Sequence, residues 1–175
     1  MNIFLGIIER YSKPVVIIVS FVLFAFMLIA VNSVFKPEFT YLTQTFGYSP
    51  EKAYQMMNDY GEAGRQAHLR VLIADIVMVM LYTALFSTTI YATFSKVFNN
   101  RVALFTLCLI PFILAASQLL EVLGVFTLLT HYQNKMFLLA QMVSIVTIIK
   151  TILTYICIAL PFIGLISVIV KKVIY

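Results

Sequence analysis

The chain has 175 residues, of which 62% are apolar and only 11% are charged, and its mean hydropathy is +1.01. This composition excludes an ordinary soluble domain and is typical of a membrane protein. The formal net charge of +5 does not indicate a nucleic-acid partner, because the basic residues flank apolar segments and therefore fit membrane orientation better.

Four apolar segments are long enough to cross the ~30 Å hydrocarbon core of a bilayer as helices. The first follows a short basic amphipathic start and is too long for the core of a cleaved signal peptide. The last apolar stretch is too long for a simple crossing, so we expect its first turns to project beyond the membrane or the helix to bend at Pro161 and Gly164. The sequence thus predicts an all-α four-transmembrane-helix bundle, a single integral membrane domain over residues 1–175, with spans at about 14–35, 69–94, 102–129 and 146–170.

The charges between the spans predict their direction. The side with both termini and the loop after the second span has six basic residues and one acidic residue. The loop at residues 36–68, extended to Arg70, has four of each. By the positive-inside rule, we expect a multi-pass protein of the cell membrane with both termini in the cytoplasm and this loop outside.

The outer loop contains the start of a short extracytoplasmic helix. Ser49 is a typical N-cap residue, Pro50 suits the first helical position, and Glu51 places an acid in the first turn. Gly61 or Gly64 is expected to end this helix. The helix has an apolar face that consists of Ala53, Met56, Met57 and Tyr60. This face either packs on the outer ends of the spans or in the headgroups, or it forms a lid over a cavity.

Three ionisable residues, Asp75, Glu121 and Lys150, interrupt apolar spans, and by residue counting all three lie near the outer face. Charges at membrane depth are costly, so they usually face a bundle interior or a wet cavity and pair with one another. We expect Lys150 to pair with Asp75 or Glu121, and Tyr82 or Gln118 to complete the hydrogen bonding. The pair is either a structural ion-pair network or the polar end of a site that has a surplus carboxylate.

Other polar side chains share helix faces with these three residues. Tyr82 and His68 each lie seven residues from Asp75, and Gln118 lies three residues from Glu121. Arg65 or Arg70 of the outer loop is a candidate to balance the surplus acid. The candidate ligand-binding cluster, called the polar cluster below, therefore consists of Asp75, Glu121, Lys150, Tyr82, Gln118, Arg65 and His68.

No sequence pattern indicates metal, nucleotide or thiol redox chemistry. The histidines lack the HxxxH and HExxH spacings of zinc sites, and no phosphate-binding motif occurs. Cys108 and Cys157 lie within spans without CxxC spacing, so we expect them to be small buried apolar residues. Neither a cofactor nor a metal is expected, and the question of enzymatic activity stays open.

Several short motifs resemble those of a group of small uncharacterised bacterial four-span membrane proteins. The motifs are GYSPEKAY at residues 47–54, GEAGR at 61–65, an Asp and a Tyr in the second span, and TIIK at 147–150. In the third span the group has DxxEN, whereas QLLEV at 118–122 keeps only the glutamate. The resemblance covers most of residues 46–150 and implies a bacterial four-span membrane protein without implying an activity. EXPERA-type sterol isomerases and lipid-binding proteins share only the architecture, with acidic residues in a membrane pocket.

Two functions follow as hypotheses from the polar cluster. The first is an outer-leaflet pocket that binds, or binds and chemically converts, a lipid or another amphiphilic small molecule. The alternative is an accessory or scaffold subunit that docks a membrane protein partner and uses the charges only structurally. An ion or proton path is less favoured, because no polar relay continues through residues 76–94.

Overall fold

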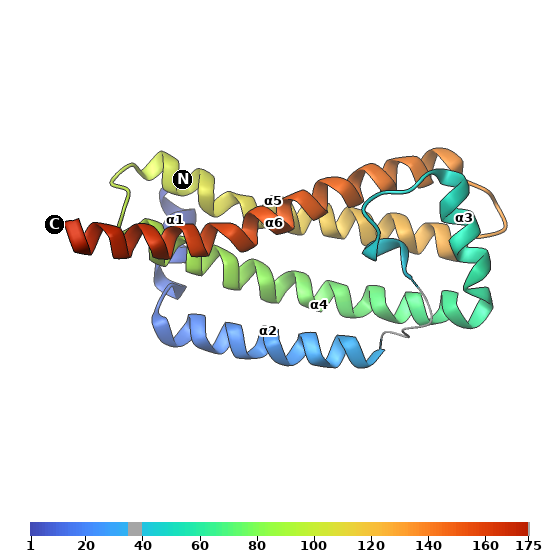
Figure 1. The fold of residues 1–175 in the computed structure, drawn as a ribbon, viewed down its shortest axis with the longest axis horizontal. Coiled ribbons are helices and arrows are strands. Elements are labelled where there is room, and N and C mark those ends of the chain that lie inside the picture. The colour runs from blue at the N-terminus through green and yellow to red at the C-terminus, as the bar shows by residue number, and fades with distance from the viewer. Residues whose placement is uncertain (35–39, 175) are drawn as a thin grey trace. The chain divides into compact units, whose positions relative to one another are not determined.

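The structure is a computed structural model, and it describes residues 1–34 and 40–174 (Figure 1). The predicted end of the first span at residue 35 and the loop residues 36–39 lie outside the described residues. The helices are, in chain order, α1 (Asn2–Tyr11), α2 (Pro14–Val34), the short 3-10 turn η1 (Leu42–Gln44), α3 (Pro50–Asp59), α4 (Gly61–Phe94), α5 (Arg101–Thr130) and α6 (Phe137–Ile174).

Four of the described helices, α2, α4, α5 and α6, are long and apolar enough to cross a membrane. A bilayer core offers no water to backbone polar groups, and a helix satisfies these groups with its own hydrogen bonds. Long apolar runs therefore cross the bilayer as helices. The predicted all-α fold with four spans is therefore confirmed, and the chain is an integral multi-pass membrane protein.

Two of the spans are longer than the sequence predicts. α4 begins at Gly61 instead of near residue 69, so its first two turns are polar. Gly61 has a φ of +60° and separates α3 from α4, whereas Gly64 lies inside α4 and does not end the preceding helix. α6 continues without a break through Pro161 and Gly164, and its 38 residues correspond to about 57 Å of helix, which exceeds a ~30 Å core.

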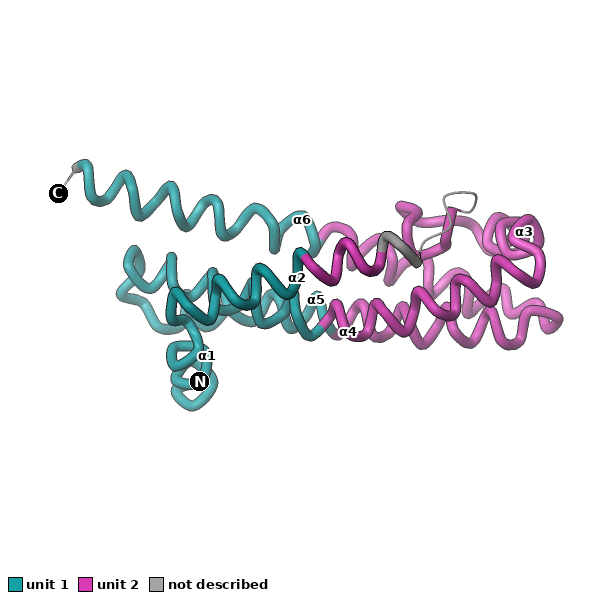
Figure 2. The backbone as a smooth tube through the Cα atoms, turned by 90° about the horizontal axis from the view of Figure 1, so that it is seen from below, with its two compact units in different colours: residues 1–25, 80–115, 153–175 teal, residues 26–79, 116–152 magenta. Residues whose placement is uncertain are grey.

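The packing divides the chain into two compact units, and all four long helices, α2, α4, α5 and α6, contribute residues to both (Figure 2). Unit 1 consists of residues 1–25, 80–115 and 153–175. In its core, Leu5 and Ile8 of α1 pack with residues of α4 and α5. One of these residues is Cys108, a buried free thiol of α5. Cys157 is also free and buried, so both cysteines are the buried thiols that the sequence predicts.

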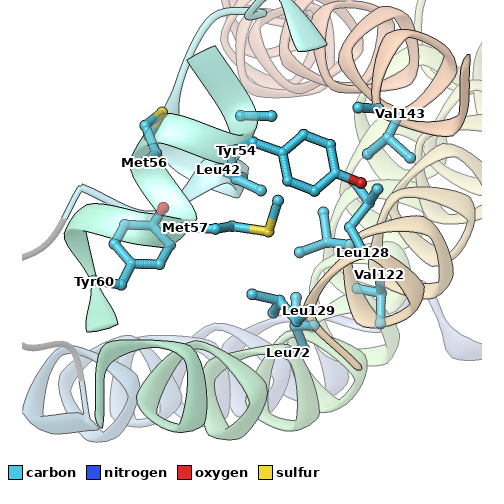
Figure 3. Packing of buried hydrophobic residues seen from close by; sticks show 13 residues of the cluster. Leu42, Tyr54, Met56, Met57, Tyr60, Leu72, Val122, Leu128, Leu129 and Val143 are labelled. Carbon is cyan, nitrogen blue, oxygen red and sulfur yellow. The ribbon is translucent and has the colours of Figure 1, made fainter. Parts of the chain in front are cut away.

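Unit 2 consists of residues 26–79 and 116–152, and its core confirms the predicted packing of α3. Ser49 caps this helix, because its hydroxyl accepts a hydrogen bond of 3.2 Å from the Lys52 N–H. The buried face of α3 packs on α4, α5 and α6 (Figure 3). This core includes Ala53, Met56, Met57 and Tyr60 from α3 and its C-cap, Leu72 from α4, Val122 and Leu128 from α5, and Val143 from α6.

Candidate functional site

The centre of the candidate site in unit 2 is an ion pair between α5 and α6. Lys150 Nζ lies 2.7 Å from Glu121 Oε2 and 2.9 Å from Glu121 Oε1. Glu121 is fully buried and Lys150 is 8% exposed. The sequence predicts that Lys150 pairs with one of two carboxylates, and Glu121 is that partner.

Two further hydrogen bonds complete the surroundings of this pair. The Thr147 hydroxyl donates a hydrogen bond of 2.7 Å to Glu121 Oε1. Lys150 Nζ donates one of 3.0 Å to the backbone carbonyl of Thr43 in η1. A buried ion pair offsets its desolvation cost only when such additional bonds satisfy the remaining polar atoms. Thr147 of α6 and the Thr43 carbonyl of the loop before α3 supply these additional bonds.

The loop that supplies Thr43 is fixed to α6 by its own contacts. The Tyr48 N–H donates a hydrogen bond of 2.8 Å to the Ser144 hydroxyl. Gly47 has a φ of +79°, and a Cβ there would lie 2.8 Å from Ile148 Cδ1, so only glycine permits this close approach. Burial raises the pKa of the Tyr48 phenol, and the charge of nearby Glu121 raises it further, so this residue stays protonated.

These loop contacts are the part of the site that sequence reasoning missed. Helix periodicity relates Thr147 to Lys150, but it carries no information about which carbonyl of a loop approaches the ammonium group. Gly47, three residues before α3, is the available sequence signal, because glycine readily adopts the positive φ that this loop has there.

Asp75 has a different environment from Glu121. It is partly buried in α4, and its charge interacts with those of Lys150 and Glu121. Within residues 1–34 and 40–174, however, its carboxylate has no hydrogen bond or ion pair. The predicted surplus carboxylate is therefore Asp75, because both oxygens of Glu121 are already bonded to Lys150.

The sequence predicts that Tyr82 or Gln118 completes the hydrogen bonding of the ion pair, and this prediction is wrong for Gln118. Thr147 and the Thr43 carbonyl complete the ion pair, whereas Gln118 forms no side-chain hydrogen bond in the described part of the chain. Gln118 and Glu121 share a face of α5, but the side chain that donates a hydrogen bond to Glu121 beside Lys150 is Thr147 of α6. Tyr82 belongs to unit 1, where its ring packs against Phe86 with the centroids 6.1 Å apart.

His68 is not bonded to the ion pair. It is fully buried, and its ring packs against Tyr41 and Tyr60 with centroid distances of 4.7 and 5.9 Å. Neither ring nitrogen has a hydrogen-bond partner among the described residues. His68 therefore belongs to an aromatic contact between α4 and the segments on either side of α3.

Arg65 also has other partners than the surplus acid. Its guanidinium donates a hydrogen bond of 3.0 Å to the Met57 carbonyl and lies 4.3 Å from the centre of the Tyr132 ring. The last carbonyls of a helix lack intrahelical partners and attract cations, which explains why Arg65 is drawn to the end of α3. Arg65 thus fastens α3 to α4 and to the segment between α5 and α6.

The ion pair, the loop and Asp75 can be compared with the sites of known proteins only through their chemistry. Comparisons of this chain with protein-family models, curated proteins and solved structures found no match. Chemically, Glu121 and Lys150 neutralise each other and are buried, so neither is presented to a ligand. Asp75 is the acidic group of the polar cluster that keeps its hydrogen-bonding capacity.

Proposed function

We propose that this integral membrane protein binds a lipid or another amphiphilic molecule through Asp75. The observation that carries the proposal is the partition of the two carboxylates in unit 2. Glu121 takes both short contacts to the Lys150 ammonium group, and Asp75 stays without a direct partner in the described residues. A carboxylate without a partner at membrane depth is a functional-site hypothesis, because packing alone does not require its cost.

The surroundings of Asp75 support a ligand with an apolar part. Val71 and Leu72, one turn before it on α4, are buried, whereas Ile73, Ile76 and Val77 are exposed. Asp75 therefore lies at the border between the packed face of α4 and an exposed apolar face. A ligand whose head donates a hydrogen bond or carries a positive charge would reach the carboxylate while its tail lies along the exposed face.

A second function is favoured by the completeness of the ion pair. Glu121, Lys150, Thr147 and the Thr43 carbonyl satisfy one another without any ligand. That arrangement is what an accessory or scaffold subunit needs, because it fixes the packing of α5, α6 and the loop before α3. In this case, a membrane-spanning partner protein would supply the positive group that Asp75 lacks.

The location and the origin of the protein belong to the same proposal. The excess of basic residues beside both termini supports a multi-pass protein of the cell membrane with cytoplasmic termini and with η1 and α3 outside. The GYS, GxxGR and TxxK motifs support membership of the bacterial four-span group.

Native mass spectrometry of the protein released from its own membranes tests the two functions. We expect the unsubstituted protein to retain an amphiphile, and Asp75→Asn to lose it while Lys150 and Glu121 keep the fold. The matched control is Asp59→Asn, which removes an exposed carboxylate of α3 outside the cluster.

Each outcome separates the hypotheses. Loss of the bound amphiphile in Asp75→Asn alone supports the binding function. Retention of the same amphiphile by Asp75→Asn contradicts it. Co-release of a membrane protein that Asp75→Asn loses would replace it by the accessory-subunit function.

A further inference from the structure

A groove of about 550 Å³ lies in unit 2 between α3 and the segment that joins α5 to α6. Residues of α3 between Glu51 and Asn58 line one side, and residues between Tyr132 and Phe137 line the other. Its volume falls in the range of ~300–1,000 Å³ that small-molecule sites have. Asp75, the residue to which the function above is assigned, does not line the groove, so the two proposals can be tested separately.

Three of the residues that line the groove, Tyr54, Tyr132 and Phe137, are aromatic and are called its floor below. Tyr54 packs edge-to-face with Phe137 at a centroid distance of 5.6 Å, and its ring lies 6.2 Å from Tyr132. The Tyr54 hydroxyl accepts a hydrogen bond from the Met136 N–H, and the Tyr132 hydroxyl donates one of 3.1 Å to Asn58. Phe137 is 44% exposed and thus offers an apolar surface. Such a preformed floor lowers the ordering cost of binding.

The rim of the groove carries polar side chains that are available to a ligand. Glu51 and Gln55 are four residues apart on α3 and share one helix face, and Gln133 and Lys135 lie opposite. The side chains of Gln55, Gln133 and Lys135 are exposed and form no hydrogen bond within the described residues. Hydrogen bonds from its own backbone N–H and from Ser49 lower the pKa of the Glu51 carboxyl, which keeps it an acceptor.

The charges around the groove exclude two classes of ligand. A quaternary ammonium group binds best when several aromatic faces enclose it, but the Arg65 guanidinium already covers Tyr132 at 4.3 Å and Tyr54 is buried, so among the lining aromatic residues Phe137 is left as the exposed ring. A phosphate would gain Lys135 but would meet the negative charge of Glu51 on the same rim. One acid, one base and uncharged amides leave no net charge for an ionic ligand to neutralise.

We propose that this groove binds a neutral saccharide. The C–H face of a sugar ring is apolar and would stack on Phe137, while its hydroxyl groups would exchange hydrogen bonds with the amides of Gln55 and Gln133 and donate to Glu51. Amides match hydroxyl groups because both donate and accept hydrogen bonds.

Saturation-transfer NMR on the full chain tests this site. The protein is held in lipid nanodiscs, because sugar-headed detergents would compete with the saccharide. The neutral probes are maltose and N,N′-diacetylchitobiose, and the charged probes are choline and inorganic phosphate. We expect a neutral disaccharide to bind, and the double variant Gln55→Ala with Gln133→Ala to bind it about tenfold more weakly. Gln66→Ala is the matched control, since this exposed amide of α4 lies outside the groove.

A second variant, Phe137→Leu, separates stacking from hydrogen bonding. It keeps an apolar residue but removes the flat ring, so we expect it also to weaken sugar binding, with helical content unchanged by circular dichroism. Three results would overturn the proposal: no saccharide binding at concentrations on the order of 10 mM, binding of choline or phosphate instead, or equal affinity in the double variant and the control.

Discussion

Replacement of Lys150 by methionine should destabilise unit 2 strongly. Methionine keeps an unbranched apolar chain but removes three hydrogen bonds, two to Glu121 and one to the Thr43 carbonyl. Fully buried Glu121 then retains only the Thr147 hydroxyl as a partner. Leaving one charge of a buried pair unpaired costs about 3–5 kcal/mol, although uptake of a proton by the carboxyl relieves part of this cost.

The matched variant removes both charges. Lys150→Met with Glu121→Met leaves neither charge of the buried pair, and the single hydroxyl hydrogen of Thr147 can be donated to the Val143 carbonyl, 3.0 Å away. The double variant, and equally a triple variant that also makes Asp75 apolar, should therefore be more stable than Lys150→Met alone.

Unfolding by sodium dodecyl sulfate in mixed micelles, followed by circular dichroism, measures the free energies of unfolding. Polar contacts between membrane helices often contribute only about 1 kcal/mol, because the reference state in the membrane also finds partners. Lys150→Met would refute this reasoning if it lowered the free energy of unfolding by less than that value. A smaller loss of stability in Lys150→Met than in the double variant would also refute the idea that the pair is enclosed and dependent on both charges.

The other predictions concern packing, capping and orientation. Gly124→Ala should cost about 1–3 kcal/mol, because a Cβ there would lie 2.2 Å from Val143 Cγ2, and Val143→Ala should restore the stability measured by the same unfolding assay; no rescue would mean that the clash is elsewhere. Ser49→Ala should cost about 1 kcal/mol by removing the N-cap of α3, detected as faster proteolysis of this helix; an unchanged rate contradicts the capping role. A cysteine in place of Lys52 should react with an impermeant label in intact cells, whereas one in place of Lys96 should not, and the reverse pattern would invert the orientation.

The sequence was sufficient for the fold because membrane spans depend on local properties. Apolar length fixes α2, α4, α5 and α6, and the Ser49–Pro50 pair fixes the start of α3. The beginning of α4 was predicted eight residues late, because hydropathy does not detect polar helical turns such as the one that contains Arg65.

The candidate site was predictable only in part, because it depends on contacts between distant segments. The pairing of Lys150 with one of two acids follows from the energetic cost of an unpaired charge at membrane depth. The choice of Glu121, however, depends on how α5 and α6 pack. The position of His68 among tyrosines depends on the path of a loop, and helix periodicity carries no information about that path.

The hydrogen bond from Lys150 to the Thr43 carbonyl joins residues that are 107 positions apart, so it constrains the order of assembly. The segment with η1 and α3 is synthesised long before α6, so its anchors Ser144 and Lys150 in the first half of α6 do not yet exist at that time. Contacts of such high sequence separation form late, after a large loss of chain entropy. Resistance of the loop to protease should therefore appear only once the last span has been inserted, which makes this loop a natural reporter of completed membrane integration.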